Sequence, residues 1–254
     1  MTHPLGAGLE CFPSTYPVHG QVLTSVCRAM DRAAGVLAGI TPEQLMATAG
    51  RAVAAVAAPW AAGARAVLVL CGPGDNGGDG YEAAPHLARA GHTVRVLDLA
   101  PATVAARRSA AATAARARCA AHPGVQVAHG DAELLRRELA SATHVVDALF
   151  GAGLARDLEG WWLHAVQAIA SSPTRVLAVD VPSGVDADTG AVRGAALRAE
   201  LTVTLVTPKR ALLPPSPAAE RCGRIVQASL GLPWALHGPW VAATPTPPGA
   251  GSTR

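Results

Sequence analysis

Carboxylates and glycines follow several short apolar runs of the chain, at positions where acid–base chemistry is possible. The first run leads into "GPGDNGGDG", with Asp75 and Asp79. Asp147 and Asp180 lie within two later runs, just before "FGAGLARDLEG" and "PSGVDADTG". Another run leads into "TPKR", which contains Lys209, the only lysine of the chain. Carboxylates that converge cost free energy unless a cation or a proton joins them, so the pattern predicts a site that holds one or the other.

The elements that bring these residues together are short strands alternating with helices. Continuous apolar runs separated by helical patterns are typical of a parallel sheet that is covered on both faces. We therefore predict a three-layer α/β domain with a mostly parallel sheet, and ligands outside the carboxyl ends of its strands. The predicted strands span residues 66–71, 93–99, 125–128, 144–149, 175–181 and 201–206.

Two helices are predicted before the first strand. The first covers residues 21–38, and the second begins after Thr41 as N-cap, with Pro42 at its first position and Gln44 completing a capping box. We expect residues 1–20 to be an extension, 21–235 the domain, and 236–254 a free tail rich in Pro, Gly and Ser.

The glycine-rich stretch also fits the dinucleotide fingerprint G-x-G-x-x-G, with Asp98 at the end of the next strand as a possible ribose ligand. The match is weak, because Gly77, Gly78 and Gly80 oppose a helix until about Asp79 and so predict a longer loop. A phosphate-binding loop also presents backbone N–H groups rather than carboxylates. An ordinary NAD-dependent dehydrogenase is therefore the least favoured of the enzymes considered.

Composition excludes several other classes of protein. A net charge of +3, from 21 Lys and Arg against 18 Asp and Glu, gives no reason to expect nucleic acid as a partner. No run of about 18 uncharged apolar residues is present, so we expect no membrane span and a soluble, cytoplasmic protein. The histidines lack the spacing of a transition-metal site. We expect the five cysteines to be buried thiols and four arginines (107, 108, 116 and 118) to form a solvated helix face.

Five stretches together resemble the NAD(P)H-hydrate epimerases, whose domain is also the N-terminal half of bifunctional nicotinamide-nucleotide repair enzymes. They are "LMATAG", "GPGDNGGDG", "VVDALFGAGL", "AVDVPSGVDADTG" and "LTVTLVTPKRALL", in the family's order and spacing over roughly residues 22–232. The resemblance implies a Rossmann-like fold, a homodimer, and binding of hydrated NADH or NADPH together with a potassium ion.

The resemblance also assigns roles to individual residues. Asp180 faces the hydrated ring, while Asn76, Asp147 and Ser183 match the family's potassium ligands. Lys209 either offsets phosphate charge from the rim of the site or is a solvated surface lysine. The nucleotide is held by two segments, Asp75, Asn76, Gly77, Gly78 and Asp79, and Gly151, Ala152, Gly153, Leu154, Ala155, Arg156 and Asp157.

The implied reaction needs an acid and a base. Inverting C6 of the reduced nicotinamide ring requires its C–O bond to break and water to return from the other face. The ring nitrogen can expel the hydroxyl as an iminium forms, provided that an acid protonates the leaving oxygen. We predict Asp180 as the group that does both jobs, as acid on departure and base on return.

The chain departs from the family's pattern at four positions. Asp75 stands where the family usually has asparagine, Ala47 and Thr48 replace an acid and an amide, and Pro85 stands where the family commonly has an arginine. These changes leave two alternatives open: a re-purposed enzyme of the same fold that isomerises, cyclises or eliminates on another small metabolite, and a non-catalytic binding or scaffolding module. The carboxylate of Asp75 also predicts weakened binding of a dinucleotide.

Overall fold

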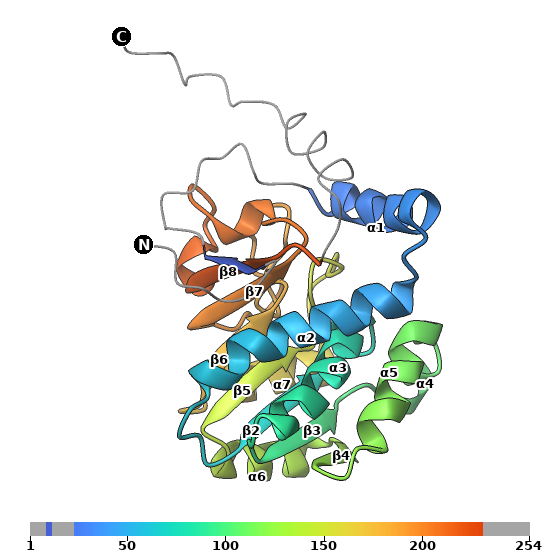
Figure 1. Cartoon of the computed structure of the whole chain (residues 1–254). Coiled ribbons are helices and arrows are strands. Elements are labelled where there is room, and N and C mark those ends of the chain that lie inside the picture. Colours follow the sequence, from blue (N-terminus) through green and yellow to red (C-terminus); the bar gives the residue numbers. More distant parts are fainter. Residues whose placement is uncertain (1–8, 12–22, 231–254) are drawn as a thin grey trace.

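The fold is organised around one twisted sheet, and Figure 1 shows α2 and α3 lying across it. The structure is a computed structural model that describes residues 9–11 and 23–230. Its eight strands lie in the order β1-β8-β7-β6-β5-β2-β3-β4. They are β1 (Leu9–Cys11), β2 (Val67–Cys71), β3 (Val94–Asp98), β4 (Val125–His129), β5 (His144–Ala148), β6 (Arg175–Val179), β7 (Leu201–Leu205) and β8 (Arg224–Ala228).

Helices cover both faces of the sheet, as the strand pattern predicts. The α-helices are α1 (Thr24–Ala38), α2 (Pro42–Trp60), α3 (Asp75–Arg89), α4 (Ala102–Ala105), α5 (Ala110–Ala120), α6 (Ala132–Ser141) and α7 (Gly160–Ala170), with 3-10 turns η2 (Arg210–Leu212) and η3 (Ala219–Arg221). One core joins α2, α3 and α5 to the face that carries Val67 and Val69. A second core joins α6 and α7 to the face that carries Leu68 and Leu70. The predicted three-layer α/β architecture is confirmed.

The strand order places a crevice between β2 and β5. From β2 the chain proceeds to β3 and β4 on one side, whereas β5 and the strands after it lie on the other side. Ligands of open parallel sheets bind at such a reversal, outside the carboxyl ends of the strands. The segments that follow β2 and β5 begin at Gly72 and Leu149, so both lie at this crevice.

Two strands were missed by the sequence analysis. Strand β8 has a mixed polar pattern, and it pairs in parallel with β7. Strand β1 has three residues and pairs antiparallel with β8, so part of the predicted extension 1–20 joins the sheet. So short a segment carries no periodicity from which a strand can be predicted. The predicted tail, 236–254, lies outside the described residues.

The second helix begins as its sequence predicts. Thr41 is the N-cap of α2, its hydroxyl accepts from the Gln44 backbone N–H at 3.2 Å, and the Gln44 side chain accepts from the Thr41 N–H at 2.8 Å. The capping box therefore satisfies two N–H groups at the helix start. Helix α1 follows the prediction to its end at Ala38, with Gly39 in the left-handed conformation behind it.

The prediction of a long glycine loop before α3 is wrong. The helix begins at Asp75, so the stretch from Asp75 to Asp79 is already helical. A Cβ at Gly77 would overlap the carbonyl oxygen of Gly72, and one at Gly78 would overlap the Met46 side chain. A Cβ at Gly80 would press against Ala148. These glycines are needed for close packing inside the helix, which outweighs their low helix propensity.

Pro85 lies inside α3, well past the first turn, so the helix continues without one of its backbone hydrogen bonds. It is buried, as are Ala83 and Ala84 before it. Pro85, one of the four departures from the family's pattern, is therefore a core residue of α3.

Three of the four arginines on the predicted solvated face form ion pairs with described residues. Arg108 is buried, with 6% of its side chain exposed, and pairs with Asp98, which also pairs with Arg116 at 2.8 Å. Arg118 pairs with Glu82. The expectation of a wholly solvated face is wrong for Arg108, and the carboxylate of Asp98 is bound within the protein instead of facing a ribose.

The cysteines are buried thiols where their side chains are described. Cys27, Cys71, Cys119 and Cys222 are all free and buried. The side chain of Cys11 lies outside the described part of the chain.

Candidate functional site

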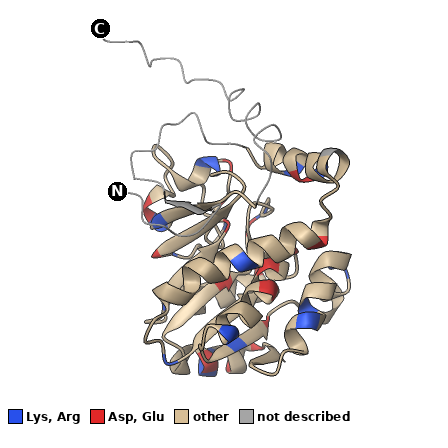
Figure 2. Ribbon diagram, viewed as in Figure 1, with Lys and Arg blue, Asp and Glu red and all other residues tan. Residues whose placement is uncertain are grey.

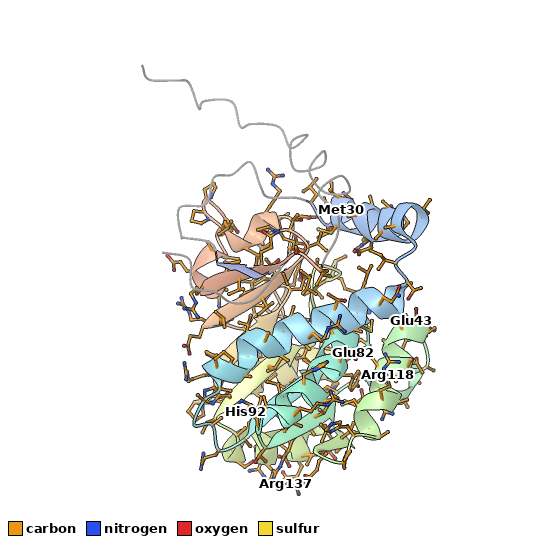
Figure 3. All side chains as sticks on the ribbon, in the orientation of Figure 1. Met30, Glu43, Glu82, His92, Arg118 and Arg137 are labelled. Atoms are coloured by element: carbon orange, nitrogen blue, oxygen red, sulfur yellow. The ribbon has the colours of Figure 1, made fainter. Side chains whose placement is uncertain are left out.

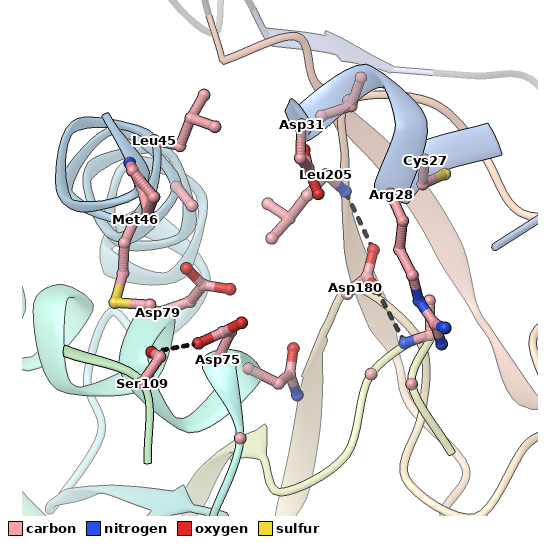
Figure 4. A pocket seen from close by; sticks show the side chains of 18 of the residues that line it. Cys27, Arg28, Asp31, Leu45, Met46, Asp75, Asp79, Ser109, Asp180 and Leu205 are labelled. Atoms are coloured by element: carbon pink, nitrogen blue, oxygen red, sulfur yellow. Dashed lines mark hydrogen bonds between the residues drawn. The ribbon is translucent and has the colours of Figure 1, made fainter. Parts of the chain in front are cut away.

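A pocket of about 730 Å³ opens above the crevice between β2 and β5. One wall comes from the segment between β2 and α3 and the start of α3, and another from the segment that follows β5. Helices α1 and α2 close the remaining side, and Figure 4 shows their side chains facing those of α3 and β6 across the space. Four carboxylates line it, from Asp31, Asp75, Asp79 and Asp180.

Asp180 is held at the end of β6 by a dense set of contacts. Its backbone has φ 69°, a left-handed conformation that is rare outside glycine, and its N–H donates to the Val203 carbonyl at 2.8 Å. One carboxylate oxygen accepts from the Ala152 N–H at 3.0 Å, and the other from the Leu205 N–H at 3.3 Å and from Lys209. The side chain is thus fixed in one orientation at the pocket wall, and strain of this kind concentrates at functional sites.

Lys209 is neither at the rim nor on the surface, so both sequence interpretations of its position are wrong. The residue is 2% exposed, and its ammonium pairs with Asp180 and donates to the Leu205 carbonyl at 2.7 Å. Burial lowers the pKa of this amine, but the charge of Asp180 opposes the effect and the pKa ends above its ordinary value. Lys209 therefore remains a cation that positions Asp180.

Beneath the pocket, Asp147 and Ser183 form a fully buried pair. Asp147 accepts from the Ser183 N–H at 2.8 Å, from its hydroxyl at 2.6 Å, and from the Leu149 N–H at 3.2 Å. The Ser183 hydroxyl also accepts from the Phe150 N–H at 2.9 Å and lies 3.2 Å from the Phe150 carbonyl. Burial raises the pKa of Asp147 to about 6, although the hydrogen bonds from Ser183 and Leu149 act the other way.

Asn76 lies in the first turn of α3, on the opposite side of Gly151. A Cβ at Gly151 would sit 2.8 Å from Asn76 Oδ1 and 3.0 Å from Asp180 Oδ2, so any other residue would force one of these side chains to shift. Asn76 Nδ2 is buried without a hydrogen-bond partner among the residues that the structure describes. The amide of Asn76 therefore retains binding capacity that the protein itself does not satisfy.

Asp75 and Asp79 lie on the first turns of α3, and Figure 4 shows both beside Met46. Asp75 is exposed and accepts from the Ser109 hydroxyl at 2.6 Å. Asp79 is buried, and burial together with the nearby charges of Asp180, Asp75 and Asp31 raises its pKa well above the ordinary value, with Lys209 opposing. The helix start thus presents one exposed carboxylate and one that resists ionisation.

The structure gathers some of the predicted site residues and separates others. Asp75, Asn76, Asp79, Asp180 and Lys209 all line the pocket. Gly77 and Gly78 are packed within the core of the fold instead. In the second predicted segment, the pocket is lined by Gly151, Ala152, Gly153 and Leu154, whereas Ala155, Arg156 and Asp157 are absent from its wall.

Trp161 and Trp162, in the first turn of α7, pack behind this second segment. Trp161 donates from its indole N–H to the Leu99 carbonyl at 2.9 Å, and Trp162 meets Phe150 edge to face with 4.9 Å between ring centroids. Both contacts hold the chain after β5 against the core.

The sequence analysis missed the contribution of α1. Arg28, Asp31 and Arg32 extend the polar lining of the pocket from this helix. Their spacing of three and four residues places them on one helix face, but nothing in the sequence shows that this face turns toward the carboxyl ends of the strands.

Comparison with known proteins places the chain in a family. The sequence profile described as "YjeF-related protein N-terminus" matches residues 42–211. The chain belongs to this family. The match covers the crevice and every predicted ligand, whereas α1 lies before it.

Relatives of two lengths share this domain. The chain is 40% identical over 215 residues to the bifunctional NAD(P)H-hydrate repair enzyme of Thermofilum pendens, covering 84% of this chain and 40% of that protein. It is 36% identical over 208 residues to the NAD(P)H-hydrate epimerase of Achromobacter xylosoxidans, covering 82% of this chain and 95% of that one. The chain thus spans about 40% of its bifunctional relative and almost all of the shorter one.

The fold agrees with a solved structure as well. The crystal structure of the yeast protein ynu0 superposes with a TM-score of 0.65 at 25% identity, covering 75% of this chain and 82% of that one. The Rossmann-like α/β fold implied by the sequence motifs is therefore confirmed.

Proposed function

We propose that this protein is an NAD(P)H-hydrate epimerase, which interconverts the two C6 epimers of hydrated NADH and NADPH. The observation that carries the proposal is the Asp180–Lys209 pair, with a strained carboxylate fixed at the wall of a pocket of about 730 Å³. The shorter relative, which this chain nearly spans, is an NAD(P)H-hydrate epimerase, and this supports the same conclusion.

The pair explains how one site can serve both steps of the inversion. The C6–O bond breaks as the ring nitrogen supplies its electron pair, and the leaving oxygen takes a proton and departs as water. Asp180 gives a proton to this oxygen and takes one back when water adds to the other face, while Lys209 holds its carboxylate in place. The Ala152 and Leu205 N–H groups keep the carboxylate oriented throughout. A reaction of this kind consumes no cofactor and leaves the composition of the substrate unchanged, although the oxygen at C6 is replaced by one from water.

Binding of the proposed substrate gives the first test. Hydrated NADPH should raise the melting temperature, because a ligand at 100 times its dissociation constant adds about 2.7 kcal/mol to the free energy of unfolding. For a chain of this size, that corresponds to a shift of about 5 °C or more. Differential scanning fluorimetry with hydrated NADPH measures the shift, and NADP⁺ at the same concentration controls for binding of the phosphates alone. No shift with any hydrated nucleotide would contradict the proposal.

A potassium site is proposed from Asn76, Asp147 and Ser183. These residues offer amide, carboxylate and hydroxyl oxygens, and the Ser183 hydroxyl lies 3.2 Å from the Phe150 carbonyl. A hard cation prefers oxygen ligands of this kind. The Asn76 amide fits a potassium ligand. Its Nδ2 is buried without a hydrogen-bond partner among the described residues, and rotating the amide by half a turn would put its oxygen at that position. A bound potassium ion would supply positive charge to a site whose pocket is lined by the carboxylates of Asp75, Asp79 and Asp180.

Potassium should therefore stabilise the protein specifically. We expect a melting temperature at least about 3 °C higher in potassium chloride than in sodium chloride at equal ionic strength, since a ligand of the folded state alone raises its stability. Asn76→Ala should abolish the difference between the two salts. Equal melting of the wild-type protein in both salts would rule the site out.

Two further proposals follow from the family resemblance and are testable in the same preparation. We expect a homodimer, which sedimentation analysis measures, and a cytoplasmic location, which fractionation measures. Within the described residues, none of the helices combines the length and apolar character needed to cross a membrane.

A further inference from the structure

Helix α1 contributes two arginines to the pocket that have no partner within the described chain. Arg28 and Arg32 both line the pocket, both are exposed, and neither forms an ion pair with a described residue. They are four residues apart and so share one face of the helix. Figure 4 shows Arg28 reaching from α1 past Asp180, and Figure 2 shows α1 carrying basic and acidic residues.

The helix is anchored, so its arginines form a fixed wall. The Thr24 N–H and hydroxyl donate to the two carboxylate oxygens of Asp188 at 2.7 and 2.9 Å. Met30 and Ala34 are fully buried against Val206, which follows β7. Helix α1 is thereby held over the same strand ends that carry Asp180.

The opposite wall is unable to take a phosphate in the usual way. A helix start after a glycine-rich turn offers backbone N–H groups and a positive dipole to anions. Here Asp75 is the first residue of α3 and is exposed to the pocket, so its own negative charge occupies that end of the helix. The ammonium of Lys209 is already paired with Asp180.

Among the described residues of the lining, Arg28 and Arg32 are therefore the cations that remain for an anionic ligand. Asp31 lies on the same face and leaves this stretch with a net charge of +1, from two arginines and one aspartate. A guanidinium binds phosphate oxygens through two parallel hydrogen bonds, which a single lysine does not match.

We infer that Arg28 and Arg32 bind the diphosphate of the dinucleotide, and that α1 is the phosphate-binding wall of the site. The inference rests on the proposed function, since it assigns the anionic part of that substrate to a helix outside the residues matched by the family profile. It also explains how a pocket with a carboxylate at Asp75 accepts a negatively charged ligand.

The test uses ADP-ribose, which carries the diphosphate without the reduced ring, so that binding is measured apart from turnover. Calorimetric titration at low salt should show affinity at least about tenfold lower for Arg28→Gln/Arg32→Gln than for the wild-type protein, with a smaller difference at high salt where charges are screened. Arg28→Lys/Arg32→Lys should recover part of the loss. Asp75→Asn should tighten binding at least about tenfold, because it removes a like charge close to the phosphates.

A matched control is Arg137→Gln, whose site lies at the opposite end of the molecule from Met30 of α1 (Figure 3) and is exposed. It should bind ADP-ribose as the wild-type protein does. Equal affinity of the double glutamine variant and the wild type would overturn the inference, and so would failure of the folded wild-type protein to bind ADP-ribose. If the wild-type protein bound ADP-ribose through the two arginines but showed no epimerase activity, the proposed reaction would be overturned and the binding inference would stand.

Discussion

Asp180→Asn should lower the turnover of hydrated NADPH by at least about 100-fold, because a general acid–base group contributes about 10² to 10⁴ in rate. The amide is nearly isosteric with the carboxylate, although its single oxygen can accept from only one of the two N–H groups, that of Ala152 or that of Leu205. It cannot exchange a proton with the leaving hydroxyl. The loss should appear in kcat, since the interaction acts in the transition state. Steady-state kinetics with chirally resolved epimers measures it.

Stability has to be separated from chemistry in this variant. The neutral amide leaves the buried Lys209 ammonium without its carboxylate, and breaking a buried pair costs about 3–5 kcal/mol. Asp180→Asn/Lys209→Met removes the unpaired charge and should be equally inactive. Glu133→Gln changes an exposed carboxylate of α6, outside the pocket wall, and should keep wild-type turnover. A folded Asp180→Asn variant with wild-type kcat would remove Asp180 from the mechanism.

Gly77→Ala should destabilise the fold by at least about 2 kcal/mol, as overpacking in a tight contact does. Alanine gains about 1 kcal/mol of helix propensity over glycine, so the steric penalty must exceed this gain. The new methyl group would overlap the Gly72 carbonyl, a backbone atom that cannot rotate away. Chemical denaturation followed by circular dichroism measures the free energy of unfolding.

Gly74→Ala is the matched control within the same motif. No described atom lies within 4 Å of a Cβ at Gly74, and its φ of −94° suits any residue. Its free energy of unfolding should differ from wild type by less than about 1 kcal/mol. If both variants were equally stable, close packing would not explain the glycine at position 77.

The sequence predicts the architecture well, because a buried parallel sheet leaves a strong imprint. The strands β2 to β7 appear as apolar runs, and the capping residues Thr41 and Gln44 predict the start of α2. The sequence does not predict the start of α3, because helix propensity disfavours glycine, whereas the structure requires Gly77 for its close contact with Gly72 and Gly78 for its close contact with Met46.

The sequence predicts which residues lie at the site, but it does not predict whether their side chains are buried or paired. The strand-end positions of Asp147 and Asp180 follow from periodicity. The buried pairing of Lys209 does not, because a lysine beside a turn has the same local sequence whether it is solvated or enclosed. The role of Arg28 and Arg32 depends on how α1 docks through Thr24 and Met30, which no local pattern encodes.

The central claim, inversion at C6 through loss and return of water, is tested most directly by incubating one pure epimer of hydrated NADPH in ¹⁸O-labelled water with the protein. We predict that the opposite epimer forms faster than it does spontaneously and carries ¹⁸O at C6, and that Asp180→Asn leaves the rate near the spontaneous one. Formation of the opposite epimer at no more than the spontaneous rate with folded wild-type protein would contradict the account.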